Sequence, residues 1–159
     1  MTTVSKRQQI LEQIKALFEA VSDNEAAADP FPLKPSPNGV GIGPLSMVDL
    51  QKRFTIGIVP GDEIKKDLFP FKEAILPVTV EFKGVKQKGD PDPGVFAEML
   101  LTICQRVCLA NMNLGLPDMV FNVSETGNSI DMETFGDKAV AGTLDFIVQY
   151  RHSMHDPRA

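Results

Sequence analysis

A chain of 159 residues with 43% apolar and 23% charged residues has the composition of one globular domain, which argues against global disorder. Its 16 basic and 21 acidic residues give a net charge of −5. This acidic balance makes a nucleic-acid-binding surface unexpected, because such surfaces concentrate Lys and Arg against phosphates. We therefore predict a single domain over residues 1–159 that does not bind DNA specifically.

Nothing in the chain predicts a membrane span or an export signal. No stretch approaches the roughly 20 apolar residues that a membrane span needs, and the N-terminal segment lacks the continuous apolar core of a signal peptide. Cys104 and Cys108 lie one helical turn apart in an apolar run, where a disulfide would constrain almost nothing. We interpret both as reduced and buried, and expect a protein that stays in the cytoplasm or in a particle assembled there.

The first element is predicted as a helix from about Thr3 to Val21. Ser5 is a candidate N-cap, with Thr2 and Thr3 as alternatives. Polar side chains cover one side of this helix, as expected of a surface helix laid on a sheet. Apolar side chains recur on the other side at helical spacing: Ile10, Leu11, Ile14, Leu17, Phe18 and Val21.

Residues 22–46 form a Pro- and Gly-rich arm or loop. Five prolines and three glycines between Ser22 and Pro44 leave no room for a helix or a central strand. A loop of this length in a small domain is unusual, so it is either an arm ordered by contact with a neighbour or a mobile or self-packed loop. Phe31 and Leu33 are its apolar anchors, and we take them as candidate interface residues.

Two strands are predicted after the loop. Residues 54–59 (FTIGIV) alternate in side-chain type and stop at the turn signal Pro60-Gly61. Residues 75–85 (ILPVTVEFKGV) alternate as an antiparallel strand does when one of its faces is buried. The charged and aromatic connection between the two strands holds Phe69 and Phe71, which we add to the candidate interface residues.

A second helix is predicted from Pro93 to about Asn111, with Asp92 as its N-cap. Its apolar surface is much wider than the arc of roughly 100° that is usual for a surface helix. We therefore expect cover on two sides, one from the sheet and the other from the first helix or a second subunit. Its narrow polar stripe consists of Glu98, Thr102, Gln105 and Arg106.

Two strands close the chain. Residues 119–125 (MVFNVSE) form the first, a long polar connection runs to Lys138, and residues 139–151 form the last and longest strand. The predicted element order is α-β-β-α-β-β. The predicted fold class is α+β, a single mainly antiparallel sheet that carries both helices on one side. One face of the last strand is formed by Val140, Leu144, Phe146, Val148 and Tyr150.

The sequence offers no constellation of residues that could run catalysis. His152 and His155, with Asp156, have the residue types of a metal site. However, Pro157 and the end of the chain oppose a rigid helix there, so a solvated or interface tail is the better interpretation. We predict no enzyme activity, no cofactor and no metal, and we add Arg151, His152 and His155 to the candidate interface residues.

From about Phe54 to its end, the chain resembles the tail terminator family of long-tailed bacteriophages. The resemblance rests on the order of elements, the ILPVTVEF strand, the GDPDPG start of the second helix and the final GTLDFIVQYRHSMHDPRA. It implies a small α+β virion subunit, located at the head-proximal end of the tail and assembled in the host bacterial cytoplasm. Copies of such a subunit close into a ring, typically a hexamer. The ring caps the growing tail tube, ends its polymerisation and presents a surface to the head-side connector, while DNA passes through the channel without specific binding.

Other hypotheses stay open beside this one. The chain could be another head–tail connector or head-completion ring subunit, or a small cytosolic ligand-binding or enzymatic α+β domain. For a ring, we expect residues 30–44 and the tail 151–159 to contact neighbouring subunits, because neither segment shows a self-contained structure in its sequence pattern. No membrane partner is expected.

Overall fold

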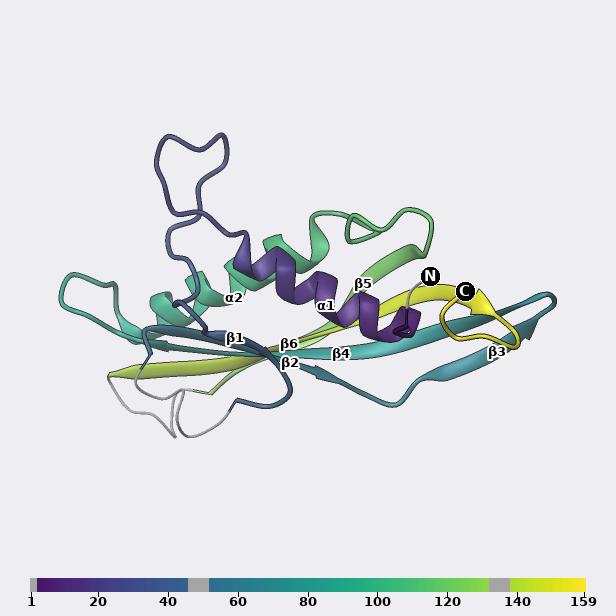
Figure 1. The fold of residues 1–159 in the computed structure, drawn as a ribbon. Coiled ribbons are helices and arrows are strands. Elements are labelled where there is room, and N and C mark those ends of the chain that lie inside the picture. Colours follow the sequence, from purple (N-terminus) through teal and green to yellow (C-terminus); the bar gives the residue numbers. More distant parts are fainter. Residues whose placement is uncertain (1–2, 46–51, 132–137) are drawn as a thin grey trace.

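The computed structural model describes residues 3–45, 52–131 and 138–159. Two helices, α1 (Lys6–Glu19) and α2 (Pro93–Leu109), lie on one face of a six-stranded sheet (Figure 1). The sheet order is β1-β2-β4-β6-β5, and β3 pairs with the part of β4 that extends beyond β2. The strands are β1 (Val40–Ile42), β2 (Phe54–Pro60), β3 (Ile64–Leu68), β4 (Phe71–Val85), β5 (Val120–Asp131) and β6 (Ala139–Ser153).

The predicted α+β class, with one sheet and two helices, is confirmed, but the predicted element order needs correction. Two further strands are present, and β1 runs parallel to β2, so the sheet is mixed. β1 is only three residues long and lies inside the Pro- and Gly-rich loop. Proline and glycine disfavour strands, so the sequence pattern does not indicate β1. β3 (IKKDL) is exposed along its whole length, so it lacks the apolar alternation by which strands are recognised.

Helix α1 begins at Lys6, and the Ser5 side chain accepts a hydrogen bond from the Gln8 backbone N–H at 3.1 Å. Ser5 is therefore the N-cap, and the helix ends at Glu19, before Val21. Its predicted apolar side packs on the sheet, because the side chains at the centre of that stripe are fully or almost fully buried. These are Ile10, Leu11, Ile14 and Phe18.

Helix α2 ends at Leu109, and Asp92 occupies the N-cap position without a side-chain hydrogen bond to the helix. Seven of its side chains are buried, and α1 lies beside it on the same face of the sheet (Figure 1). Helix α1 therefore covers part of the wide apolar surface of α2, in addition to the sheet. Val95, in the first turn, is left 58% exposed.

The long strand β4 tolerates Pro77 because of where that residue lies. β2 pairs with β4 up to Val78, and β3 begins its pairing at Ile75, so Pro77 falls in the gap between the two partners. Its carbonyl accepts a hydrogen bond from the Gly61 N–H at 2.8 Å. A proline lacks an N–H, and at this position no neighbouring strand requires one.

β5 is longer than predicted, since it runs to Asp131 and includes the first part of the stretch that we expected to be a polar connection; residues 132–137 of that stretch lie outside the described residues. It lies at the edge of the sheet, and its pairing with β6 has two irregularities, between Val120 and Asn122 and between Glu125 and Gly127. Bulges of this kind break the two-residue periodicity and are common at sheet edges. The sequence pattern therefore fades after Glu125 although the strand continues.

An ion pair fastens the β4–α2 loop to the start of β2. The Arg53 guanidinium donates to both carboxylate oxygens of Asp90, at 3.0 and 3.1 Å, and the Gln87 N–H donates to the same carboxylate. Both side chains are largely shielded from solvent. The hydrogen bond from Arg53 lowers the pKa of Asp90 below its usual value, although burial acts in the opposite direction.

This ion pair predicts a stability change in acid. Because the folded-state pKa of Asp90 is lowered, its contribution is present above the unfolded-state value near 4 and is lost as pH falls through the folded-state pKa. Asp90→Asn should lower the free energy of unfolding by about 1–2 kcal/mol at pH 7 and change it little at pH 2. Urea denaturation at both pH values measures this, and an equal loss at both would contradict it.

Candidate assembly surface

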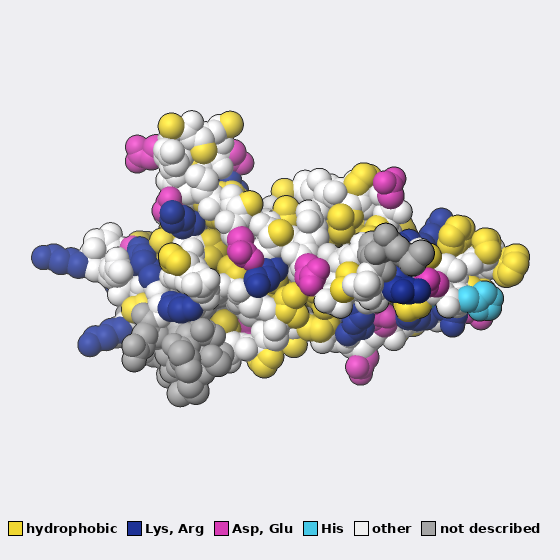
Figure 2. Space-filling view, in the orientation of Figure 1, with side chains coloured by type: hydrophobic (Ala, Val, Ile, Leu, Met, Phe, Trp, Pro, Cys, Tyr) yellow, Lys and Arg dark blue, Asp and Glu magenta, His cyan; other side chains and the backbone are white. Residues whose placement is uncertain are grey.

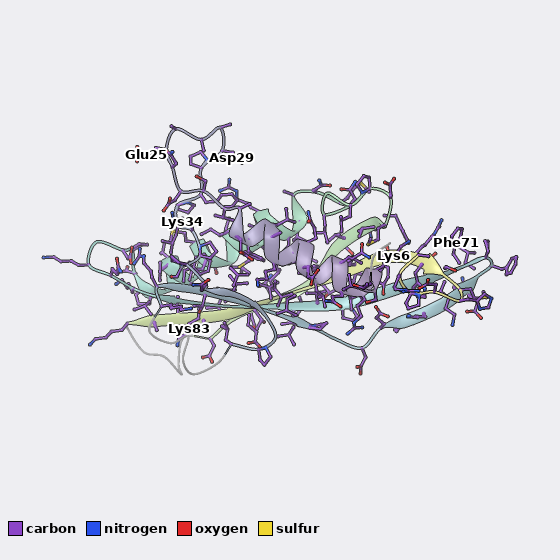
Figure 3. The ribbon with its side chains drawn as sticks, in the orientation of Figure 1. Lys6, Glu25, Asp29, Lys34, Phe71 and Lys83 are labelled. Atoms are coloured by element: carbon purple, nitrogen blue, oxygen red, sulfur yellow. The ribbon has the colours of Figure 1, made fainter. Side chains whose placement is uncertain are left out.

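The β3–β4 hairpin projects from one end of the sheet and carries a cluster of exposed apolar side chains (Figures 1 and 2). Ile64 is 68% exposed, Leu68 42%, Phe69 83% and Phe71 45%. We name these four residues the apolar tip; Leu68, Phe69 and Phe71 lie at the turn of the hairpin, and Ile64 lies on the same strand nearer its base. Phe71 points outward at the end of the molecule in Figure 3. Aromatic and aliphatic side chains gathered at this exposure are typical of a surface that another molecule covers.

The pairing register puts most of the apolar tip on the sheet face that lacks helices. Ile64 lies opposite Ile75, and Leu68 lies opposite Phe71, on the face that alternates with the buried Ala74 and Leu76. Helices α1 and α2 cover the other face (Figure 1). No described helix therefore packs over the apolar tip.

A polar network anchors the base of the hairpin to the body of the domain. Glu63, directly before β3, has a side chain only 9% exposed. Its carboxylate accepts a hydrogen bond from the Tyr150 hydroxyl and lies 3.4 Å from Arg7 and 3.5 Å from Lys65. Burial, with the Glu63 carboxylate next, raises the pKa of Tyr150. The phenol therefore stays protonated and donates, so the network joins α1, β3 and β6.

His152 extends this network to the end of β6. It is 4% exposed, its Nε2 lies 2.9 Å from Lys65 Nζ, and its Nδ1 lies 2.7 Å from the Ser153 carbonyl oxygen. An ammonium can only donate, so Nε2 must accept and Nδ1–H must donate to the carbonyl. This geometry assigns the neutral Nδ1–H tautomer to His152 and gives it a structural position inside the protomer.

The network predicts that Glu63→Gln destabilises the fold. The substitution removes the charge that both cations face, so the free energy of unfolding should fall by about 1–2 kcal/mol, less than for a fully buried pair because Arg7 and Lys65 are partly exposed. Glu73→Gln is the matched control, since Glu73 lies 4.0 Å from an Arg151 that is half exposed. Urea denaturation should show less than about 0.5 kcal/mol for the control. Equal losses in the two variants would contradict the role of the network.

The other predicted interface residues of the tail differ in accessibility. Arg151 and His155 are exposed, and the Arg151 guanidinium lies 5.1 Å from the centre of the Phe121 ring. The tail also folds back on the chain. The Met154 N–H donates to the Pro70 carbonyl at 3.2 Å, and the Lys6 N–H donates to the Pro157 carbonyl at 2.9 Å. The expectation that residues 151–159 have no self-contained structure is therefore wrong.

Phe31 and Leu33 lie against the domain core. Leu33 is buried, and Phe31 is partly buried, with the Arg106 guanidinium 3.9 Å above its ring. Backbone hydrogen bonds continue along this segment, from the Ser36 N–H to the Phe54 carbonyl and from the Ile56 N–H to the Gly39 carbonyl. Residues 30–44 thus pack on their own domain. The expectation that this segment has no self-contained structure is therefore also wrong. The part that projects is residues 22–30 (Figures 1 and 3).

Among the described residues, no group of three or more His, Cys, Asp or Glu side chains could bind a metal. Cys104 and Cys108 are fully buried, and burial raises the pKa of both thiols, so neither is a reactive thiolate. A shallow hollow of about 270 Å³ between the end of α1 and residues 34–40 is lined mainly by polar and proline side chains. Ligand sites are usually larger and more apolar.

Neither helix in the described part of the chain is long and apolar enough to cross a membrane. A scan against protein-family models finds no match to this chain, and a search of curated proteins finds no matching protein. The case for a function therefore rests on the geometry of the described residues and on the resemblance in the sequence. Among the described residues, the apolar tip includes the two most exposed large apolar side chains, Ile64 and Phe69.

Proposed function

We propose that this protein is a structural subunit of a bacteriophage tail, a tail terminator whose copies form a ring. The ring caps the tail tube, ends its polymerisation and offers a surface to the head-side connector. It acts in the virion, at the head-proximal end of the tail, after assembly in the host bacterial cytoplasm. The observation that carries the assembly part of the proposal is the apolar tip on the projecting hairpin. The assignment to a bacteriophage tail rests on the sequence resemblance.

An exposed apolar tip supports assembly for an energetic reason. Burying apolar surface contributes about 25 cal/mol per Å², and a free monomer forgoes this contribution at the tip. The hairpin is also held firmly at its base by the Glu63–Tyr150 hydrogen bond, so it is preorganised for contact. A contact between unlike surfaces of identical subunits produces a ring when its rotation closes.

The acidic charge suits a channel through which DNA passes. A net charge of −5 gives no general attraction to phosphates, so DNA is not expected to bind the finished ring tightly. We propose that assembly requires neither metal nor nucleotide. Ring formation and tube capping should therefore be unchanged by EDTA, and loss of either in EDTA would contradict this part of the proposal.

Negative-stain electron microscopy and native mass spectrometry of the purified chain test ring formation. The proposal predicts closed rings with an open channel, either for the free protein or after addition of tail tubes. A chain that stays monomeric under both conditions would contradict the proposal that copies form a ring. Rings that form but do not bind tubes would point instead to another head–tail connector subunit.

A further inference from the structure

β3 is an edge strand of the described sheet. It pairs with β4 on one side, and no described strand pairs with its other side (Figure 1). All five of its residues are exposed. About half of the backbone N–H and C=O groups of an edge strand point away from its only partner. The partner that satisfies such a row of groups is the backbone of another extended strand.

The side chains of β3 favour a second copy of β3 as that strand. The segment reads IKKDL, with an apolar residue at each end and its charges between them. When two copies run antiparallel with Lys66 opposite Lys66, Ile64 of each copy lies opposite Leu68 of the other. The same register puts Lys65 of each copy opposite Asp67 of the other. Opposed apolar residues and opposed unlike charges both stabilise antiparallel strands.

The neighbouring strand β4 fits this register on the sheet face that lacks helices. Glu73 lies opposite Lys66 in the β3–β4 pairing, so each Lys66 at the centre of the contact has a carboxylate beside it. Each apolar residue of β3 on this face likewise has an apolar residue of β4 beside it. The two copies together would form two apolar rows across four strands, each made of Ile75, Ile64, Leu68 and Phe71.

On the other face, the charges alternate in sign across the contact. Lys72 lies 3.7 Å from Asp67, and Lys65 lies 3.5 Å from Glu63. With Asp67 of one copy opposite Lys65 of the other, each charge in the row is next to one of the opposite sign. The one contact between like charges in this register is the contact between the two Lys66 side chains. Lysine on an edge strand commonly opposes pairing, so this contact should limit the strength of the dimer.

We propose that two copies of the free protein pair through β3, antiparallel and about a two-fold axis at Lys66. The contact is isologous, because each copy contributes the same five residues. The inference goes beyond the proposed function, since a two-fold contact joins only two copies and does not by itself close a ring. A ring requires a further contact, so either proposal can fail while the other stands.

Single cysteines test the register. Opposed residues in an antiparallel pair have Cβ atoms about 4.5–5.5 Å apart, close to the separation in a disulfide. Lys66→Cys should therefore form a disulfide-linked dimer at least about tenfold faster than Ile64→Cys or Leu68→Cys alone, as followed by non-reducing gel electrophoresis. An equimolar mixture of Ile64→Cys and Leu68→Cys should link about as fast as Lys66→Cys. The natural Cys104 and Cys108 are buried, so they do not interfere.

Charge variants test the same register without a covalent bond. Lys66→Thr removes the contact between like charges and should tighten dimerisation about threefold in sedimentation equilibrium. Asp67→Lys puts lysine opposite lysine at both symmetric positions and should weaken dimerisation at least about fivefold. Glu25→Lys is the matched control, because Glu25 is exposed on the projecting loop and should leave dimerisation unchanged. Circular dichroism confirms that the variants are folded.

Two results would overturn the inference. The first is a Lys66→Cys variant that links no faster at high protein concentration than Glu25→Cys, which carries its cysteine on the projecting loop. The second is a Lys66→Thr variant that dimerises more weakly than the wild type. Tube capping tests the proposed function separately, and its outcome depends on neither result.

Discussion

Gly142→Ala is expected to destabilise the protein by about 3 kcal/mol, the upper end of the usual range for overpacking a core. A Cβ at this position would lie 2.5 Å from the Ser129 carbonyl oxygen and 2.5 Å from Cζ of Phe82. The Phe82 ring is fully buried, and the Ser129 oxygen belongs to the neighbouring strand β5. Neither atom can move away without disturbing the sheet, so the effect should be large.

The matched control for this variant is Gly41→Ala in β1, where a Cβ meets no heavy atom within 4 Å. Differential scanning calorimetry should show a fall in melting temperature of about 6–12 °C for Gly142→Ala and less than about 2 °C for Gly41→Ala. Similar melting temperatures for the two variants would mean that β4, β5 and β6 pack less closely around Gly142 than described.

Replacing both aromatic residues of the apolar tip, Phe69→Ser with Phe71→Ser, is expected to abolish assembly while the fold remains intact. Both side chains are exposed, at 83% and 45%, so the free energy of unfolding should change by less than about 1 kcal/mol. Aromatic anchors at the centre of an interface often cost 2 kcal/mol or more each when removed, so self-association should fall by at least about a hundredfold.

Met112→Ser is the matched control for the tip, because Met112 is 62% exposed but lies in the α2–β5 loop, away from the hairpin. Sedimentation velocity and urea denaturation should be run on the wild type, the double variant and the control. Assembly that survives in the double variant would remove the tip from the interface. Assembly lost equally in the control would show that exposed apolar residues act without regard to position.

The sequence predicted the fold well wherever one face of an element is buried. β6 alternates without interruption, so the buried face of Val140, Leu144, Phe146, Val148 and Tyr150 was visible in its pattern. The same alternation also puts His152 on the buried face. Pro157 and the end of the chain follow closely, so the pattern alone does not show that the strand reaches His152.

The elements that were missed have no such contrast between their faces. β3 is exposed on both faces, and its charged residues are those of a solvated loop. The role of Glu63 could not be predicted, because its partners Arg7 and Tyr150 come from distant parts of the chain. Phe69 and Phe71 stand out in the sequence as aromatic residues in a charged connection. The sequence does not indicate the hairpin that brings them to one projecting end.

The most direct measurement of the central claim is a tube-capping assay. Tail tube protein encoded in the same genome is allowed to polymerise with increasing amounts of this chain, and tube lengths are measured by electron microscopy. The proposed function predicts short tubes with a ring at one end, and long uncapped tubes when Phe69→Ser with Phe71→Ser replaces the wild type. Tubes of the same length with and without the wild-type chain, and with no ring at either end, would contradict it.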